Sequence, residues 1–320
     1  MKNLPLDFIL SFCKEKIANH GEDSYCYIFG ENSGTVAVFD GCGGAGAQTH
    51  ECYGGHTEAY MASRFASGVL FEGITNFLPD DREIDKTVHE VLFPLIQQAM
   101  KQNEPVSSDK GFQIKGSMIR TLPTTVAVAV VCAESEKSAR VSSVWAGDSR
   151  VYIMNSEGLF QLTSDDTTVP DPFENLYEDG ILKNIICSDR NVKANHAEVS
   201  VEYPFLAFSA TDGCFGYVST PMEFEGIFLK TLLNSENVAQ WESNIAKEIG
   251  AVSGDDHTLC MASFGFQDFL HLKASFVERS SFVEAEYLSK LVNLPTTNKE
   301  ERYIMWGKYK ENYLKYLKRT

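Results

Sequence analysis

Val36-Ala37-Val38-Phe39-Asp40-Gly41-Cys42-Gly43-Gly44 is an apolar, β-branched run that ends in an aspartate and a cluster of glycines. The apolar run predicts a buried strand, and the glycines release the chain from strand geometry directly after it. Asp40 is thereby placed at the tip of a strand, and the Gly41 carbonyl is available as a second oxygen ligand for a hard cation. Asp-Gly is also common in ordinary turns, so this stretch alone does not establish a metal site.

The same pattern recurs elsewhere, with an aspartate and a glycine where an apolar strand ends or begins. The recurrences are Val144-Trp145-Ala146-Gly147-Asp148-Ser149-Arg150, Leu206-Ala207-Phe208-Ser209-Ala210-Thr211-Asp212-Gly213 and Gly254-Asp255-Asp256-His257-Thr258-Leu259. Several carboxylates at strand ends favour a cation site over a set of unrelated turns.

Composition limits the class of protein. The 320 residues are 43% hydrophobic and 12% aromatic, which is typical of a globular chain with a sizeable core. The formal net charge of −16 disfavours nucleic acid and anionic membranes as partners and supplies oxygen ligands for hard cations.

The sequence predicts a cytoplasmic protein. The first residues have no signal-peptide profile, because Pro5 and Asp7 break their short apolar stretch. The longest apolar run, residues 126–133, is far shorter than the roughly 20 residues that span a bilayer. Eight cysteines without a C-x-x-C pair suit neither a zinc site nor a disulfide framework, so reduced thiols are expected.

Hydrophobic periodicity predicts strands and helices in one mixed chain. Residues 1–20 suit a short helix or an irregular lead-in, and residues 101–117 and 164–193 read as loops. Closely spaced strands in the middle of the chain are typical of an antiparallel meander in a sandwich, with helices on the outside. The predicted strands are 25–29 and 35–39 (a hairpin), 124–133, 140–146, 151–154, 159–162, 198–203, 205–210 and 257–266, and the predicted helices begin at Thr57 and span 84–102, 222–233 and 238–249.

The character of the chain changes after about residue 266. Pro295, Thr296 and Thr297 break the segment, and residues 298–320 form a basic, aromatic, helical stretch on an otherwise acidic chain. We expect a domain over 1–266 and a helical extension over 267–320. This tail either docks on the domain itself or binds a partner and regulates it.

The order of these motifs resembles the metal-dependent protein phosphatase family (PPM), the type 2C serine/threonine phosphatases, over about residues 21–266. The motifs that carry the resemblance are Glu22-Asp23, Val38-Phe39-Asp40-Gly41-Cys42-Gly43-Gly44, Thr124-Thr125-Val126-Ala127, Ala146-Gly147-Asp148-Ser149-Arg150, Ala210-Thr211-Asp212-Gly213 and Asp255-Asp256-His257-Thr258.

The resemblance implies an α+β fold, in which a central antiparallel β-sandwich is flanked by α-helices, and two Mg²⁺ or Mn²⁺ ions, with an optional third. In this reading, metal ligands come from Glu22, Asp23, Asp40, Gly41, Asp148, Asp212 and Asp255. Asp40 would bridge two ions, Glu22 would act through water, and Asp148 with Asp212 would hold the third ion. Asp255 is preferred to Asp256, because Asp256 stands where the family usually has asparagine.

The implied activity is hydrolysis of phosphoserine and phosphothreonine in proteins, opposing a serine/threonine kinase. A hydroxide bridging the two ions would attack phosphorus directly. Two alternatives remain open at this point. One is a catalytically weak relative that binds a phosphoprotein or regulates a partner, and the other is a metal-dependent phosphatase for a small phosphoester.

The family pattern is broken at several positions. Cys42 replaces the histidine thought to protonate the leaving group, so His56, His257 or a water molecule would take that role. No arginine precedes the acidic pair, which leaves Lys16 or His20 to contact phosphate. Gly216 replaces a frequent aspartate. Cys42 and Cys214, both beside predicted ligands, are either buried small residues or redox-sensitive thiols.

Overall fold

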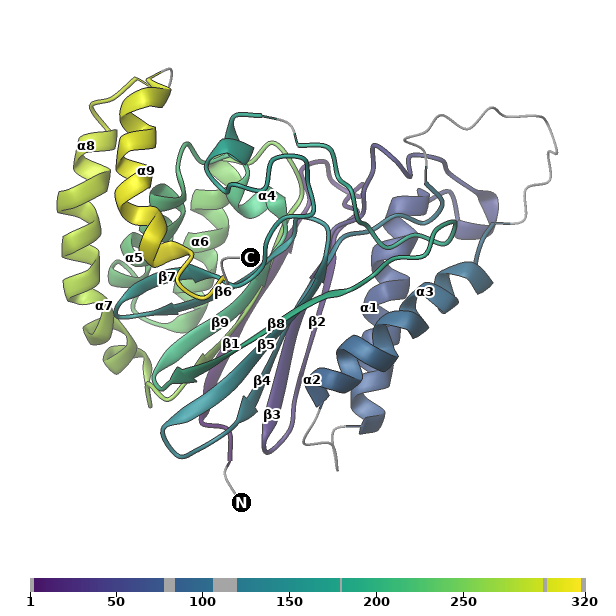
Figure 1. The fold of residues 1–320 in the computed structure, drawn as a ribbon, viewed down its shortest axis with the longest axis horizontal. Coiled ribbons are helices and arrows are strands. Elements are labelled where there is room, and N and C mark those ends of the chain that lie inside the picture. The colour runs from purple at the N-terminus through teal and green to yellow at the C-terminus, as the bar shows by residue number, and fades with distance from the viewer. Residues whose placement is uncertain (1–2, 78–83, 106–119, 179, 296–297, 318–320) are drawn as a thin grey trace.

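The computed structural model describes residues 3–77, 84–105, 120–178, 180–295 and 298–317, and it has the predicted α+β architecture. Two five-stranded antiparallel sheets pack face to face, with helices on both outer sides (Figure 1). One sheet has the order β1-β10-β9-β6-β7, and the other has the order β2-β3-β4-β5-β8. The strands are β1 (Leu6–Lys14), β2 (Ser24–Phe29), β3 (Ser33–Phe39), β4 (Val126–Ala133), β5 (Ser138–Ala146), β6 (Arg150–Asn155), β7 (Gly158–Gln161), β8 (Asn195–Glu202), β9 (Phe205–Ala210) and β10 (His257–Phe264).

The central strands are largely apolar, and both of their faces are covered. Along β3, Val36 and Val38 join the core between the two sheets, whereas Ala37 and Phe39 join the core beneath the outer helices. This alternation follows from the period of two in a strand. Every residue of β3 is therefore buried.

The outer layers are helical. One face carries α1 (Glu58–Phe77), α2 (Ile84–Thr87), the π-helical stretch η2 (Val88–Leu92) and α3 (Phe93–Gln102). The other carries α4 (Asp212–Phe215), α5 (Pro221–Leu233), α6 (Val238–Val252), α7 (Phe269–Val283), the π-helical stretch η4 (Glu284–Leu288), α8 (Ser289–Leu291) and α9 (Lys299–Tyr313). Short 3₁₀ turns, η1 (Glu51–Tyr53) and η3 (Glu174–Leu176), lie in the connections. Within the described ranges, no helix combines the length and the apolar character needed to cross a membrane.

The prediction for residues 1–20 was wrong. These residues contain strand β1, which pairs antiparallel with β10 so that Phe12 lies opposite Leu259. Its partner β10 is more than two hundred positions away in the sequence. Because an edge strand is held by hydrogen bonds to its one partner, the residues of β1 by themselves do not reveal it. The other predicted strands and helices are present, including the β2–β3 hairpin. The predicted loop at 101–117 and the break at 295–297 lie partly outside the described residues.

The C-terminal extension packs against the helical layer over the first sheet. Trp306, Tyr309 and Tyr313 of α9 are almost fully buried, in the same apolar cluster as Phe208 of β9 and Phe228 of α5. Basic residues of the extension face acidic residues of the body: Lys299 Nζ lies 2.7 Å from Glu174, Lys310 Nζ 2.6 Å from Asp171 and Lys315 Nζ 2.8 Å from Glu157.

Candidate active site

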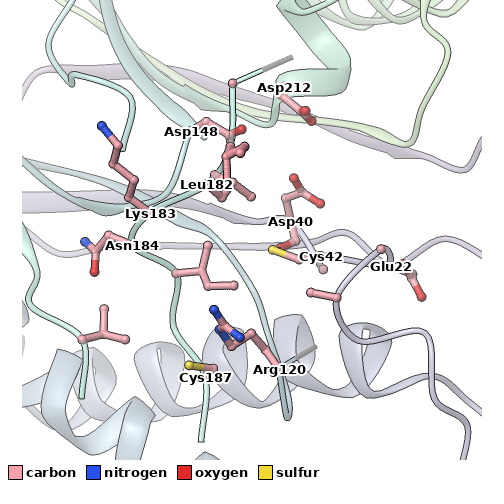
Figure 2. A pocket seen from close by; sticks show the side chains of 18 of the residues that line it. Glu22, Asp40, Cys42, Arg120, Asp148, Leu182, Lys183, Asn184, Cys187 and Asp212 are labelled. Carbon is pink, nitrogen blue, oxygen red and sulfur yellow. The ribbon is translucent and has the colours of Figure 1, made fainter. Parts of the chain in front are cut away.

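A cavity of about 950 Å³ opens at one end of the sandwich, and acidic residues form much of its wall (Figure 2). Its lining includes Glu22, Asp40, Gly41, Cys42, Asp148, Asp212, Asp255 and Asp256. These residues come from five connections, namely β1–β2, β3–α1, β5–β6, the end of β9 and the start of β10.

Strand pairing explains why connections so distant in sequence meet at one end of the sandwich. Antiparallel partners place the end of one strand beside the start of the next. Ser24 lies opposite Phe39, Val126 opposite Ala146, and Leu259 opposite Ala210. The residues just beyond these pairs therefore share one end of the sandwich.

Thr124 and Thr125 hold the backbone of Asp40 in place. The Asp40 carbonyl accepts hydrogen bonds from Thr124 Oγ1 at 2.7 Å and Thr125 N at 2.8 Å. The Thr125 hydroxyl lies 2.6 Å from the Ser149 hydroxyl, in the turn that carries Asp148. The Thr-Thr motif thus ties two of the acidic connections together.

Glu22 is oriented by contacts to its side chain and its backbone. Its carboxylate accepts a hydrogen bond from Thr57 Oγ1, and Arg64 Nη1 donates to its carbonyl at 3.3 Å. The same carboxylate lies so close to Gly43 that a Cβ at this position would collide with it. A Cβ at residue 43 would therefore displace the end of the Glu22 side chain.

Asp255 and Asp256 have different roles. Asp256 accepts backbone hydrogen bonds from Lys16 N and Glu22 N, each at 2.7 Å, so both of its oxygens hold the β1–β2 connection. Asp255 is exposed at the cavity and makes no such contact to that connection within the described residues. This geometry leaves Asp255 rather than Asp256 as the candidate ligand.

The carboxylates of the cavity repel one another. Burial, then the charge of Asp212, raises the pKa of Asp40 and that of Asp148 well above the usual range. Burial, then the charge of Asp255, raises the pKa of Asp212 to about 6. Asp148 Oδ1 is buried and has no hydrogen-bond partner within the described residues. A set of crowded, partly unpartnered oxygens fits divalent cations, which would relieve the repulsion.

Asp23 lies behind this wall. It is almost fully buried, its carboxylate accepts a hydrogen bond from Thr211 Oγ1 at 2.9 Å, and it is absent from the described lining of the cavity. Burial, opposed by hydrogen bonds from Thr258 and Thr211, raises its pKa to about 7. The acidic pair is thus divided, with Glu22 facing the cavity and Asp23 supporting it.

The structure does not bring the two candidate histidines to the cavity, and neither belongs to its described lining. His56 is exposed and stacks on Tyr60, with ring centroids 3.9 Å apart. His257 is buried against Phe12, because it stands on β10 with its side chain directed toward β1 and α6. Each histidine packs against an aromatic ring, whereas sequence reasoning expected a general acid there.

The residues expected to replace the phosphate-binding arginine also lie elsewhere. Lys16 Nζ donates to the Ser253 carbonyl at 2.6 Å, and neither Lys16 nor His20 is part of the described lining. The cations that do line the cavity are Arg120, Lys183 and Arg190. Sequence reasoning missed them, because Lys183 and Arg190 stand in a stretch that reads as a loop and Arg120 lies between the predicted loop at 101–117 and the strand predicted from residue 124. The available signal was a basic residue close to the Thr-Thr motif.

The two cysteines beside predicted ligands are protonated thiols. Burial raises the pKa of both Cys42 and Cys214 well above the usual range, and nearby carboxylates add to the rise. Cys214 Sγ contacts the Thr258 carbonyl at 3.3 Å and lies behind the cavity. Such thiols are poor proton donors and poor nucleophiles at neutral pH.

A different cluster brings three possible ligand atoms closer together. Among the described residues, Asp85, His196 and Glu198 place one ligand atom each within 4.8 Å of one another, whereas the carboxylates of the cavity are spread more widely around it. Asp85 is already satisfied by Arg140 Nη2 at 3.1 Å and Ser142 Oγ at 3.2 Å. This cluster is therefore an ion-pair network at the sheet edge.

Solved structures share this fold. The serine/threonine phosphatase Stp1 of Staphylococcus aureus aligns with a TM-score of 0.57 and 18% identity over 83% of this chain and 98% of its own. The serine/threonine phosphatase PstP/Ppp of Mycobacterium tuberculosis aligns with a TM-score of 0.56 and 16% identity over 80% of this chain and 98% of its own. The catalytic domain of PstP in complex with two manganese ions aligns with a TM-score of 0.52 and 15% identity over 80% of this chain and 97% of its own. No family model and no curated protein matches the sequence.

Proposed function

We propose that this chain, which has the fold of the PPM-type serine/threonine phosphatases, hydrolyses phosphoserine and phosphothreonine in proteins in a metal-dependent reaction. The observation that carries the proposal is the meeting of Asp40, Asp148, Asp212 and Asp255 at one cavity of that fold. The proposed place in signalling is opposite a serine/threonine kinase, in the cytoplasm.

The chain's oxygen donors suit Mg²⁺ or Mn²⁺. Asp40, with the Gly41 carbonyl, would hold both ions of a pair, with Asp212, Asp255 and Glu22 completing the set and Asp148 serving a third ion. When bound, the ions would activate the attacking water and neutralise the phosphoryl oxygens. Thr124, Thr125 and Asp256 would keep the ligand-bearing connections in register.

Proton donation to the leaving group falls to water in this proposal. Cys42 is held as a thiol of raised pKa, and neither His56 nor His257 belongs to the described lining of the cavity. Replacing either histidine by alanine should therefore leave the rate on an alkyl phosphate unchanged within about twofold. A rate loss of ten-fold or more in H56A, at unchanged stability, would return that histidine to the mechanism.

The decisive test uses para-nitrophenyl phosphate with and without Mn²⁺. D40N and D212N should lower Mn²⁺-dependent turnover by on the order of 100-fold or more, since even partners that only orient metal ligands contribute about 10 to 100-fold. E136Q, at an exposed glutamate in the β4–β5 turn, is the control. Wild-type turnover without added metal after chelation, or full activity in both aspartate variants, would contradict the proposal.

The small-phosphoester alternative is tested with the same protein. We expect a phosphothreonine peptide to be hydrolysed with a higher kcat/KM than nucleotides or sugar phosphates, because the cavity is at the upper end of the roughly 300 to 1,000 Å³ typical of ligand pockets. The reverse ranking would favour a small substrate.

A further inference from the structure

The cavity has a second, basic wall. Arg120 precedes the Thr-Thr motif, and Lys183 and Arg190 stand in the connection between η3 and β8. Figure 2 shows the Arg120 guanidinium beside Cys187, apart from the carboxylates of Asp40 and Asp212. We define Arg120, Lys183 and Arg190 as the basic wall.

The electrostatic surroundings of Cys187 agree with this position of Arg120. Burial and the charge of Asp189 raise the pKa of the Cys187 thiol to about 11, and the Arg120 guanidinium acts against that rise. Arg120 is not among the main charges that act on Asp40 or Asp212. Its backbone is anchored, since Arg120 N donates to the Ala45 carbonyl at 3.2 Å. Arg120 thus lies apart from Asp40 and Asp212. Lys183 stands nearer the turn that carries Asp148, because Lys183 N and Gly147 N both donate to Asp166.

Charge balance decides what the basic wall attracts. In the metal-free cavity, six carboxylates outweigh the three cations of the lining, which repels anions. Two divalent cations would more than cancel that excess, so the loaded cavity attracts anions on its basic side. In a chain of net charge −16, cations gathered at one cavity are not explained by overall composition.

Part of the remaining lining is apolar. Ile181, Leu182, Ile185 and Val192 belong to it. With a volume of about 950 Å³, the cavity has room for more than a single phosphorylated side chain. A segment of extended peptide that places its phosphate at the acidic wall would bring a neighbouring side chain to the basic one, because successive residues rise about 3.3 Å.

We propose that the basic wall binds a negatively charged side chain close to the phosphorylated residue of the substrate, either an acidic residue or a second phosphate. This inference rests on the proposed function and adds the substrate class: phosphoprotein segments that carry an additional negative charge beside the scissile phosphate. Guanidinium groups suit this task because they bind carboxylates and phosphates bidentately.

The test compares three peptides that share one phosphothreonine and differ only in the flanking residues, which are glutamates, a phosphoserine or glutamines. Wild-type protein with Mn²⁺ should give a kcat/KM about 10-fold or more higher for the charged peptides than for the glutamine peptide, through KM, and the ratio should fall with added salt. R120A, K183A and R190A should each lower that ratio, and R120K should retain part of it. A preference for phosphoserine alone would identify the second phosphate as the ligand.

The matched control is K193A, at an exposed lysine of the same connection that is absent from the described lining. It should keep the full ratio, and thermal unfolding of every variant checks that the fold is retained. An equal kcat/KM for all three peptides in wild type overturns the inference while leaving the proposed function intact. Equal losses on all peptides in R120A also overturn it, since they would place Arg120 at the scissile phosphate. Absence of Mn²⁺-dependent hydrolysis of any peptide contradicts the proposed function itself.

Discussion

The hydroxyl of Tyr313 on α9 lies 3.3 Å from the hydroxyl of Tyr152 on β6. Arg150 Nη1 donates to the same Tyr152 hydroxyl at 3.3 Å, and the Arg150 guanidinium makes a bidentate ion pair with Asp165 at 2.9 and 2.7 Å. Arg150 follows Asp148 by two positions. The C-terminal helix is therefore connected, through three buried polar groups, to the turn that carries a candidate metal ligand.

This contact predicts that α9 stabilises the whole domain. Y313A should lower the free energy of unfolding by about 3 to 5 kcal/mol, because it empties a buried aromatic site. Y313F should cost only about 1 kcal/mol, since it removes a hydrogen bond and keeps the packing. Urea unfolding measures both, and I304A, at an exposed residue of the same helix, is the control. A Y313A variant as stable as I304A would mean that the tail is not part of the core.

We predict that Asp256 positions the metal-binding residues, whereas Asp255 binds the metal itself. D256N keeps the shape but has one oxygen where the wild type uses two, so one of the backbone bonds to Lys16 or Glu22 is lost. The Mn²⁺ concentration for half-maximal activity should rise about 10-fold, as expected for a residue that positions a ligand. D255N should have the larger effect on the same titration. Equal effects of the two variants would make Asp256 a direct ligand.

Adjacent glycines provide a paired test of close approach. A Cβ at residue 43 would collide with the Glu22 carboxylate, whereas a Cβ at Gly44 has nothing within 4 Å. G43A should therefore weaken Mn²⁺ activation about 10-fold by displacing Glu22, and G44A should leave it unchanged. Activity against Mn²⁺ concentration is the measurement. Weakening by G44A as well would point to backbone flexibility as the cause.

The buried carboxylates predict an unusual pH dependence in metal-free protein. The pKa of Asp23 is about 7 in the folded state against 3.8 as the reference, so the folded state holds a proton that the unfolded state has released. The contribution of Asp23 to the free energy of unfolding is then fully present below about pH 4. It falls as the pH rises toward 7, by up to about 1.4 kcal/mol per pH unit for one such group. D23N should flatten this slope.

The stabilisation of the fold by Mn²⁺ should increase with pH, because the ion binds deprotonated carboxylates. We expect the rise in Tm caused by Mn²⁺ to be larger at pH 8 than at pH 5. Thermal unfolding with and without the ion checks this, and the result would be contradicted by a Mn²⁺ shift that is the same at both values.

Local sequence determined most of the architecture of this protein. β-Branched runs and glycine clusters specify strands and their ends through local backbone preferences, so the β2–β3 hairpin and the mixed fold class were predictable from particular residues. The ordered aspartate motifs, each at a strand end, also pointed to a shared cation site.

Tertiary structure decided everything that depends on distant partners. Strand β1 exists because β10 pairs with it, and the directions of His56 and His257 depend on which neighbours cover them. The basic wall and the docking of Tyr313 on Tyr152 join segments far apart in the chain. A sequence pattern reports the preference of a residue for its local conformation, whereas side-chain neighbours across the fold are set by packing and hydrogen bonding that no short stretch encodes.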